Sequence, residues 1–227
     1  FDYDVFISYG SPEGDENNMV NQWAVKFSEY LAILLNRLND RELTFMLHDD
    51  LRARKQLLGT ERPAVLTKTA IFVTLISPEF VGSESYQNEL KEIYNAVYED
   101  TNGSTRNVNR IFKVLTAPIS DEQQPECLIN EIGYDFFEIN RYSKKSRTFE
   151  IVDGEQPEEK LWFKLVDLVY DIQNSLELLV KKELQEVEKK KYIYLAETSF
   201  DQSDNRDEIR RELQYLGHHI LPLINLP

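Results

Sequence analysis

The stretch Thr69–Leu90, TAIFVTLISPEFVGSESYQNEL, determines how the rest of the chain can be arranged. Ala70–Ile76 is a continuous run of β-branched and aromatic residues, too short for a membrane span, and it predicts a strand buried on both faces. Ser77-Pro78 ends this strand, because proline restricts the residue before it and cannot donate a ladder hydrogen bond. A polar loop and a helix follow. We therefore expect Glu89 in the first turns of a helix, just past the carboxyl end of a central strand, where open α/β sheets bind ligands.

Short apolar runs and amphipathic helices alternate over about the first 140 residues. The clearest predicted helix is Met19–Leu38, with apolar residues at steps of three and four, and another begins near Ser85. The predicted strands cover residues 4–8, 43–47, 70–76, 110–115 and 134–139. This alternation predicts an α/β fold with a flavodoxin-like, five-stranded parallel sheet flanked by helices.

The sequence indicates four consecutive parts. These are a first domain (residues 1–140), a charged linker (141–157), a long helix (158–190) and a short β-α-β extension (191–227). The leucine stripe of the long helix is most simply explained by packing against the first domain, with a coiled-coil or dimer seam as the alternative. The extension is too short for a closed sheet. We expect it to dock on another part of the chain or to be the truncated start of a second, similar unit.

Composition limits the possible partners and compartments. The formal charge of −14 argues against nucleic acid, because phosphate binding requires a surface rich in lysine and arginine. Cys127 is the single cysteine, so an internal disulfide is excluded and a reduced, cytoplasmic compartment is expected. The sequence shows neither a signal-peptide pattern nor an apolar run long enough to span a membrane, so we expect no contact with a membrane. The sequence has neither a GxGxxG motif nor a P-loop, so it does not predict dinucleotide binding of the Rossmann type.

Two motifs resemble those of a known family. The first is the opening strand, Asp4–Tyr9, DVFISY; the second combines Ser77-Pro78, Phe80, Ser83 and Glu89-Leu90. Together they resemble a TIR (Toll/interleukin-1 receptor) domain of the bacterial kind over about residues 1–140, and the extension resembles the start of a second TIR-like unit. Where the family often has Trp-Cys, this chain has Ser85 and Tyr86, and Tyr86 could supply the aromatic wall of the pocket.

The resemblance implies an activity and a set of site residues. Catalytic members use the glutamate that corresponds to Glu89 to cleave NAD between nicotinamide and ribose, with NAD as the substrate and without a cofactor. The loop after the first strand would contact the substrate, with Tyr9 as a stacking surface. An acidic residue after the second strand would face the ribose, and Arg52 or Arg54 would meet phosphate. The implied substrate-binding residues are Ser8, Tyr9, Gly10, Ser11, Asp49, Arg52 and Tyr86.

Each of these residues also has a simpler explanation. A glutamate at a helix start complements the helix dipole without any further function. The residues after the first strand could be an ordinary strand-to-loop transition. The run His48-Asp49-Asp50 suggests a metal site, but adjacent residues of an extended segment point to alternate sides, so we predict none and expect at least half of them to be solvated.

Two classes of function are therefore open. The first is an NAD glycohydrolase, possibly producing a cyclic product, that acts as an effector in bacterial anti-phage defence and is activated by self-assembly or by a sensor or partner protein. The second is a non-catalytic TIR module that acts only by association with other TIR domains. Glu89 and the polar loop at residues 10–18 favour the first class. The absence of the Trp-Cys pair favours the second slightly.

Overall fold

The central element of the protein is a five-stranded sheet in which all strands run parallel. The computed structural model describes residues 1–9, 19–48, 62–98, 108–151, 158–184, 192–196, 203–215 and 218–221. The strand order is β2-β1-β3-β4-β5. The strands are β1 (Tyr3–Tyr9), β2 (Phe45–Leu47), β3 (Thr69–Ile76), β4 (Ile111–Leu115) and β5 (Gly133–Asp135). This arrangement confirms the predicted flavodoxin-like α/β fold.

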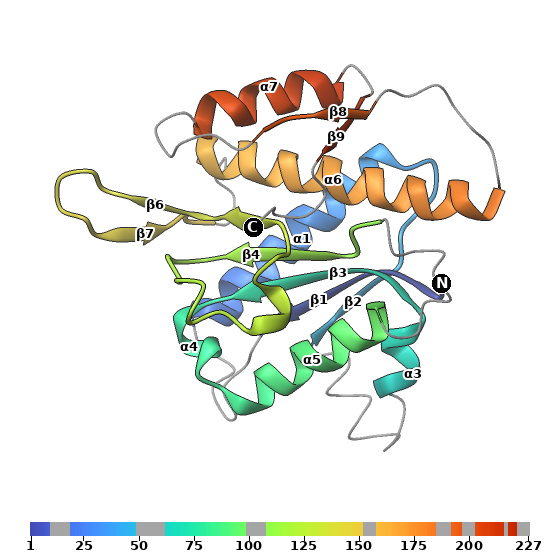
Figure 1. Cartoon of the computed structure of the whole chain (residues 1–227), viewed down its shortest axis with the longest axis horizontal. Helices are drawn as coiled ribbons and strands as arrows, with labels where there is room; N and C mark the ends of the chain where they lie inside the picture. The colour runs from blue at the N-terminus through green and yellow to red at the C-terminus, as the bar shows by residue number, and fades with distance from the viewer. Residues whose placement is uncertain are drawn as a thin grey trace.

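Helices cover the two faces of this sheet and produce three layers (Figure 1). One face packs against α1 (Met19–Leu38) and α6 (Glu159–Leu184), whose apolar residues share one buried cluster. The other face packs against α3 (Arg62–Thr67), α4 (Pro78–Val81) and α5 (Glu84–Tyr98). A short 3-10 turn, η1 (Glu126–Leu128), lies between β4 and β5. The sequence prediction treated residues 78–81 as loop and missed α4.

Strand β3 is central because every one of its residues is buried. Its two faces contribute to different clusters: Val73 packs with α1 and α6, whereas Phe72 packs with α5 and makes an edge contact with Phe6, 5.9 Å between ring centroids. A strand buried on both sides cannot alternate between apolar and polar residues, which explains the continuous apolar run.

The prediction of the fifth strand was wrong in its second half. Strand β5 ends at Asp135, and after Phe136 the chain forms β6 (Phe137–Ile139), which pairs antiparallel with β7 (Ser146–Thr148) rather than with the sheet. The segment predicted as a linker, 141–157, therefore contains a strand. It is also tied to the first domain, because Phe149 and Ile151 are buried in the cluster beneath α1 and α6.

The leucine stripe of α6 packs inside the chain, as the simpler explanation predicts. Its buried members lie in the cluster that also contains Phe27, Leu31 and Leu35 of α1; they are Leu161, Leu165, Leu168, Ile172, Leu176 and Leu179. The stripe therefore completes the core of the first domain. The structure describes the helix to Leu184, and the predicted continuation to residue 190 lies outside the described residues.

The C-terminal extension docks on the outer side of α6. Strands β8 (Tyr192–Tyr194) and β9 (His219–Leu221) pair parallel, and α7 (Ser203–Tyr215) lies beside α6 (Figure 1). The contact between the helices is polar. It includes Lys164–Asp207 at 2.5 Å, Arg211–Asp167 at 3.1 Å and an Arg210–Asp171 ion pair. The predicted docking is thus made by charged residues, while Asp204, the predicted cap of α7, lies outside the described side chains.

A buried polar cluster lies between α5 and the end of the sheet. The Tyr98 hydroxyl donates to Glu131 Oε1 at 2.9 Å, and Lys113 Nζ donates to the carbonyl of Leu128 at 3.0 Å. Burial raises the pKa of Glu131 to about 7, against the lowering effects of the Tyr98 hydrogen bond and the Lys113 charge. The folded protein therefore binds this proton more tightly than the unfolded chain, whose glutamate titrates near 4.5.

Glu131→Gln is expected to remove part of the pH dependence of stability. Because the pKa of Glu131 is raised in the folded state, the contribution of this residue to the free energy of unfolding falls as pH rises from about 4.5 to about 7 and is constant above that range. Glutamine retains an acceptor for Tyr98 and does not titrate. The variant should be more stable than wild type by about 1–3 kcal/mol at about pH 8, and the difference should shrink towards about pH 4.5. Urea denaturation at several pH values measures this; parallel curves for both proteins would contradict it.

Candidate functional site

The candidate site lies at the carboxyl edge of the sheet, where three neighbouring strands end. Strand β1 ends with Ser8 and Tyr9, β2 leads directly into His48, and β3 is followed by α4 and α5. Glu89 lies in the second turn of α5. Because β2, β1 and β3 are adjacent in the sheet, their ends bring these side chains together, at the edge where parallel sheets bind ligands.

One carboxylate oxygen receives two side chains from neighbouring strands. Ser8 Oγ donates to Glu89 Oε1 at 2.6 Å, and His48 Nδ1 lies 3.0 Å from the same oxygen. An ionised carboxylate can only accept hydrogen bonds, so an ionised Glu89 requires the proton on Nδ1 of His48. All three residues are buried, with Glu89 only 4% exposed. The carboxylate is thus fixed in orientation by groups that belong to the rigid sheet.

Two tyrosines flank the residues of this site, Tyr9 against His48 and Tyr86 near Glu89. The ring of Tyr9 lies 5.6 Å from the His48 imidazole, centroid to centroid. The hydroxyl of Tyr86 donates to the carbonyl of Leu75 at 2.6 Å, and its ring packs 5.8 Å from that of Phe80. Burial, and then the negative charge of Glu89, hold the pKa of Tyr86 well above its ordinary value. Tyr86 is therefore neutral and supports the site from the core side.

The structure brings together four of the residues that the sequence singles out: Ser8, Tyr9, Tyr86 and Glu89. The other four, Gly10, Ser11, Asp49 and Arg52, lie outside the described residues, as does Arg54, and their roles stay predictions. Glu89 is also buried rather than on the surface of its helix, because its carboxylate bonds to Ser8 at the end of β1 and lies against His48 after β2.

His48 is the site residue that the sequence reasoning missed, because it was considered only within the run His48-Asp49-Asp50. The register between the first two strands could have identified His48 as a site residue. Ile7 is paired with Leu47, so the next positions, Ser8 and His48, lie side by side at the sheet edge. Polar residues that directly follow neighbouring parallel strands point to a shared site even when their sequence separation is large.

Two further hydroxyls lie near this edge. Thr74 of β3 is paired in register with Ser8, and Ser77 follows the end of the same strand. Both hydroxyl oxygens are buried, and neither has a hydrogen-bond partner in the part of the chain that the structure describes. Buried hydroxyls without a partner are uncommon, and these two leave donors available near the carboxyl end of β3.

The described residues of this site do not form a metal-binding group. Among the described residues, no group of three or more histidine, cysteine, aspartate or glutamate side chains could hold a metal ion. The chemistry available in the described part of the site is that of one oriented carboxylate, one imidazole and several hydroxyl groups.

No described helix is long and apolar enough to cross a bilayer.

Comparisons with known proteins do not assign this chain to a family. No protein-family model matches the sequence, and no curated protein matches it significantly.

Proposed function

We propose that this protein is a TIR-type NAD glycohydrolase that cleaves the nicotinamide–ribosyl bond, with Glu89 as the catalytic carboxylate. The observation that carries the proposal is the Glu89 carboxylate, oriented by Ser8 and His48 at the carboxyl edge of a parallel sheet. The two TIR-like motifs, on β1 and on the segment from β3 to α5, supply the residues that meet there. The flavodoxin-like order of the sheet agrees with this resemblance.

The chemistry needs little more than an oriented negative charge. As the bond from ribose C1′ to the nicotinamide nitrogen breaks, the electron pair leaves with nicotinamide and the ribose acquires oxocarbenium character. A carboxylate beside the ribose stabilises this positive charge, and water attacks C1′ and loses a proton to give ADP-ribose. Attack by an atom of the adenine ring in place of water would give a cyclic product.

The remaining residues would bind the substrate. Ser8 bonds to Glu89 and Tyr9 packs against His48, and we propose that both contact the nicotinamide riboside together with Gly10 and Ser11. Asp49 would face a ribose hydroxyl. Arg52 would neutralise a phosphate, which a chain of charge −14 requires from a local cation.

The biological setting that fits this activity is bacterial anti-phage defence. Depletion of NAD is toxic, so such an enzyme must be silent until it is activated by assembly of several copies or by a sensor partner. The burial of Glu89 agrees with a silent state, because a substrate could reach the carboxylate only after a rearrangement at the sheet edge.

The same burial also favours the second candidate, a non-catalytic TIR module. In that case Glu89 serves as a structural acceptor that joins α5 to the ends of β1 and β2 through Ser8 and His48. Such a module would act only through association with other TIR domains. The two candidates differ in whether NAD is consumed.

The test is to incubate the purified protein with NAD and to measure free nicotinamide by chromatography, with and without crowding agents or cross-linking. Nicotinamide release supports the enzyme, and the ratio of linear to cyclic ADP-ribose gives the reaction course. No release from assembled protein would exclude NAD cleavage and leave the interaction module.

A further inference from the structure

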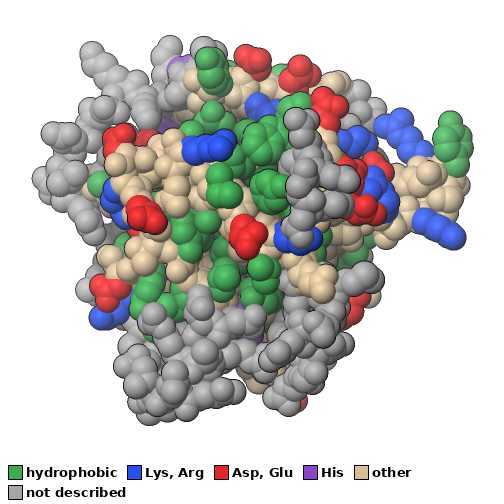
Figure 2. Space-filling view, turned by 180° about the vertical axis from the view of Figure 1, so that it is seen from behind, with side chains coloured by type: hydrophobic (Ala, Val, Ile, Leu, Met, Phe, Trp, Pro, Cys, Tyr) green, Lys and Arg blue, Asp and Glu red, His purple; other side chains and the backbone are tan. Residues whose placement is uncertain are grey.

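A hairpin formed by β6 and β7 projects from the body of the protein (Figure 1, left). Its tip has the sequence Arg141-Tyr142-Ser143-Lys144-Lys145, and all five residues are exposed. Tyr142 is 98% exposed. In Figure 2 this hairpin, now on the right, carries lysine and arginine side chains around a hydrophobic one at its end.

The tip is an ordered turn. Asn140 Oδ1 accepts hydrogen bonds from the backbone N–H groups of Tyr142 and Ser143, at 3.0 and 2.9 Å. The backbone of Asn140 pairs with Lys144 and Lys145, each at 2.9 Å. Lys144 adopts a left-handed conformation, with φ of 58°, that closes the turn. The backbone at Tyr142 is therefore ordered before binding, and the side chain is presented to solvent.

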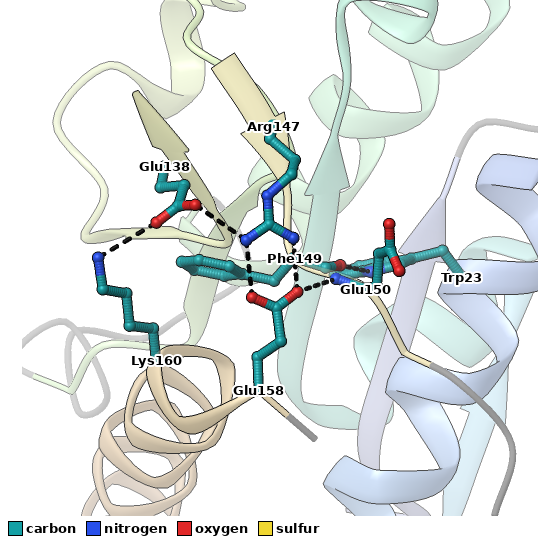
Figure 3. A network of polar contacts seen from close by, with 7 residues as sticks. All are labelled: Trp23, Glu138, Arg147, Phe149, Glu150, Glu158 and Lys160. Atoms are coloured by element: carbon teal, nitrogen blue, oxygen red, sulfur yellow. Dashed lines mark hydrogen bonds and ion pairs between the residues drawn. The ribbon is translucent and has the colours of Figure 1, made fainter. Parts of the chain in front are cut away.

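The base of the hairpin is clamped to α6 (Figure 3). Arg147 pairs with Glu158 at 2.7 Å and with Glu138 at 2.8 Å, and Lys160 pairs with Glu138 at 3.1 Å. The indole nitrogen of Trp23 donates to the carbonyl of Phe149 at 2.8 Å. These contacts hold the base of the hairpin against α1 and the start of α6.

The three cations of the tip differ from Arg147 in having no partner. Within the described residues, Arg141, Lys144 and Lys145 form no ion pair, although the chain as a whole has a charge of −14. The sequence contains no lysine or arginine between Lys113 and Arg141. This acid-only region includes an exposed connector, residues 120–126, whose carboxylates are Asp121, Glu122 and Glu126.

We propose that the tip of the β6–β7 hairpin docks on the acidic connector, residues 120–126, of a second copy of this chain. Charge complementarity supports this occupant: the tip is cationic, whereas the connector exposes three carboxylates, and Lys113, which donates to Gln124 of the connector, is buried. The exposed tyrosine supplies the aromatic anchor that such contacts use. Nucleic acid is the less suitable occupant, because three cations on a body of charge −14 give little net attraction for a phosphate backbone. The proposal does not depend on NAD cleavage, and its test measures association alone.

The test is sedimentation velocity of the full chain over a range of concentrations, at about 50 mM and about 500 mM salt. We expect the wild type to associate at low salt and to dissociate at high salt. Lys144→Glu combined with Lys145→Glu should weaken association at least about tenfold, as should Asp121→Lys combined with Glu122→Lys. An equimolar mixture of the two double variants should associate more tightly than either alone, since a reversed tip then faces a reversed connector.

Controls separate a local contact from a general effect of charge. Arg37→Glu combined with Lys68→Glu changes the net charge by the same amount at two exposed positions, on α1 and just before β3, and should associate like wild type. Tyr142→Ala should weaken association without any change in charge. A monomeric wild type at low salt, equal effects of the control and hairpin variants, or no rescue in the mixture would overturn the proposal. Binding of short duplex DNA by a protein that stays monomeric would also overturn it.

Discussion

Glu89→Gln is expected to lower nicotinamide release from NAD by at least about a hundredfold. Glutamine keeps the volume of the side chain and an oxygen that can accept from Ser8, but it removes the negative charge. In a buried site a carboxylate beside a developing cation is worth several kcal/mol of barrier, and about 1.4 kcal/mol corresponds to tenfold in rate. Because Glu89 is 4% exposed, water screens this charge little.

Folding should survive this substitution. The hydrogen bond from Ser8, 2.6 Å in the wild type, can be made to the amide oxygen, so we expect the free energy of unfolding to change by no more than about 1–2 kcal/mol. Glu92→Gln is the matched control, since Glu92 is exposed on the same helix. Its rate should stay within about twofold of wild type. Equal release by wild type and Glu89→Gln would remove Glu89 from the mechanism.

Ser8→Ala tests how much the orientation of the carboxylate contributes. The charge of Glu89 remains, but the donor to Oε1 is lost, and a hydrogen bond to a charged group is worth about 1.5–3 kcal/mol. We expect a loss of about tenfold to a hundredfold in kcat, smaller than for Glu89→Gln. An unchanged rate, measured with the same nicotinamide assay, would show that Ser8 does not position the carboxylate.

The sheet could be predicted from the sequence because its strands are short apolar runs separated by helices of regular period. For β3, burial on both faces leaves a pattern that few other structures produce. The end of the sheet could not be predicted in the same way. Residues 134–139 alternate as one strand would, but only the part up to Phe136, whose N–H donates to the carbonyl of Leu115, pairs with the central sheet, whereas Phe137–Ile139 pairs with β7. The alternation of side chains alone does not show where the chain leaves one partner strand and pairs with another.

The site was predictable only in part for a related reason. The motif around Glu89 and the polar end of β1 could be recognised locally, whereas the position of His48 depends on the register between β1 and β2. Contacts between distant segments leave little trace in the local pattern. The same holds for the docking of α7 on α6, where Asp167 and Arg211 are ordinary surface residues by sequence and form an ion pair only after folding.

Phe136→Ala is expected to lower the free energy of unfolding by about 3–5 kcal/mol. Phe136 is fully buried, and its ring makes edge contacts with Phe27 at 5.2 Å and with Trp23 at 6.0 Å, centroid to centroid. Removal of the ring takes away its transfer energy, leaves a cavity in a core that can relax only partly, and removes two aromatic contacts. Urea denaturation measures the loss.

Two further variants provide comparisons for the effect of Phe136→Ala. Phe136→Leu keeps most of the buried volume and should cost only about 1–2 kcal/mol, so it reports on the same position if the alanine variant does not fold. Tyr142→Ala removes a ring of similar size from the exposed hairpin tip and, at high salt, should change stability by less than about 0.5 kcal/mol. If the Phe136 and Tyr142 variants were equally stable, the buried Phe136 ring would contribute no more to stability than an exposed one. Phe136 directly precedes β6, and its carbonyl accepts from the N–H of Phe149 at 3.0 Å, so loss of its ring should also weaken association through the hairpin.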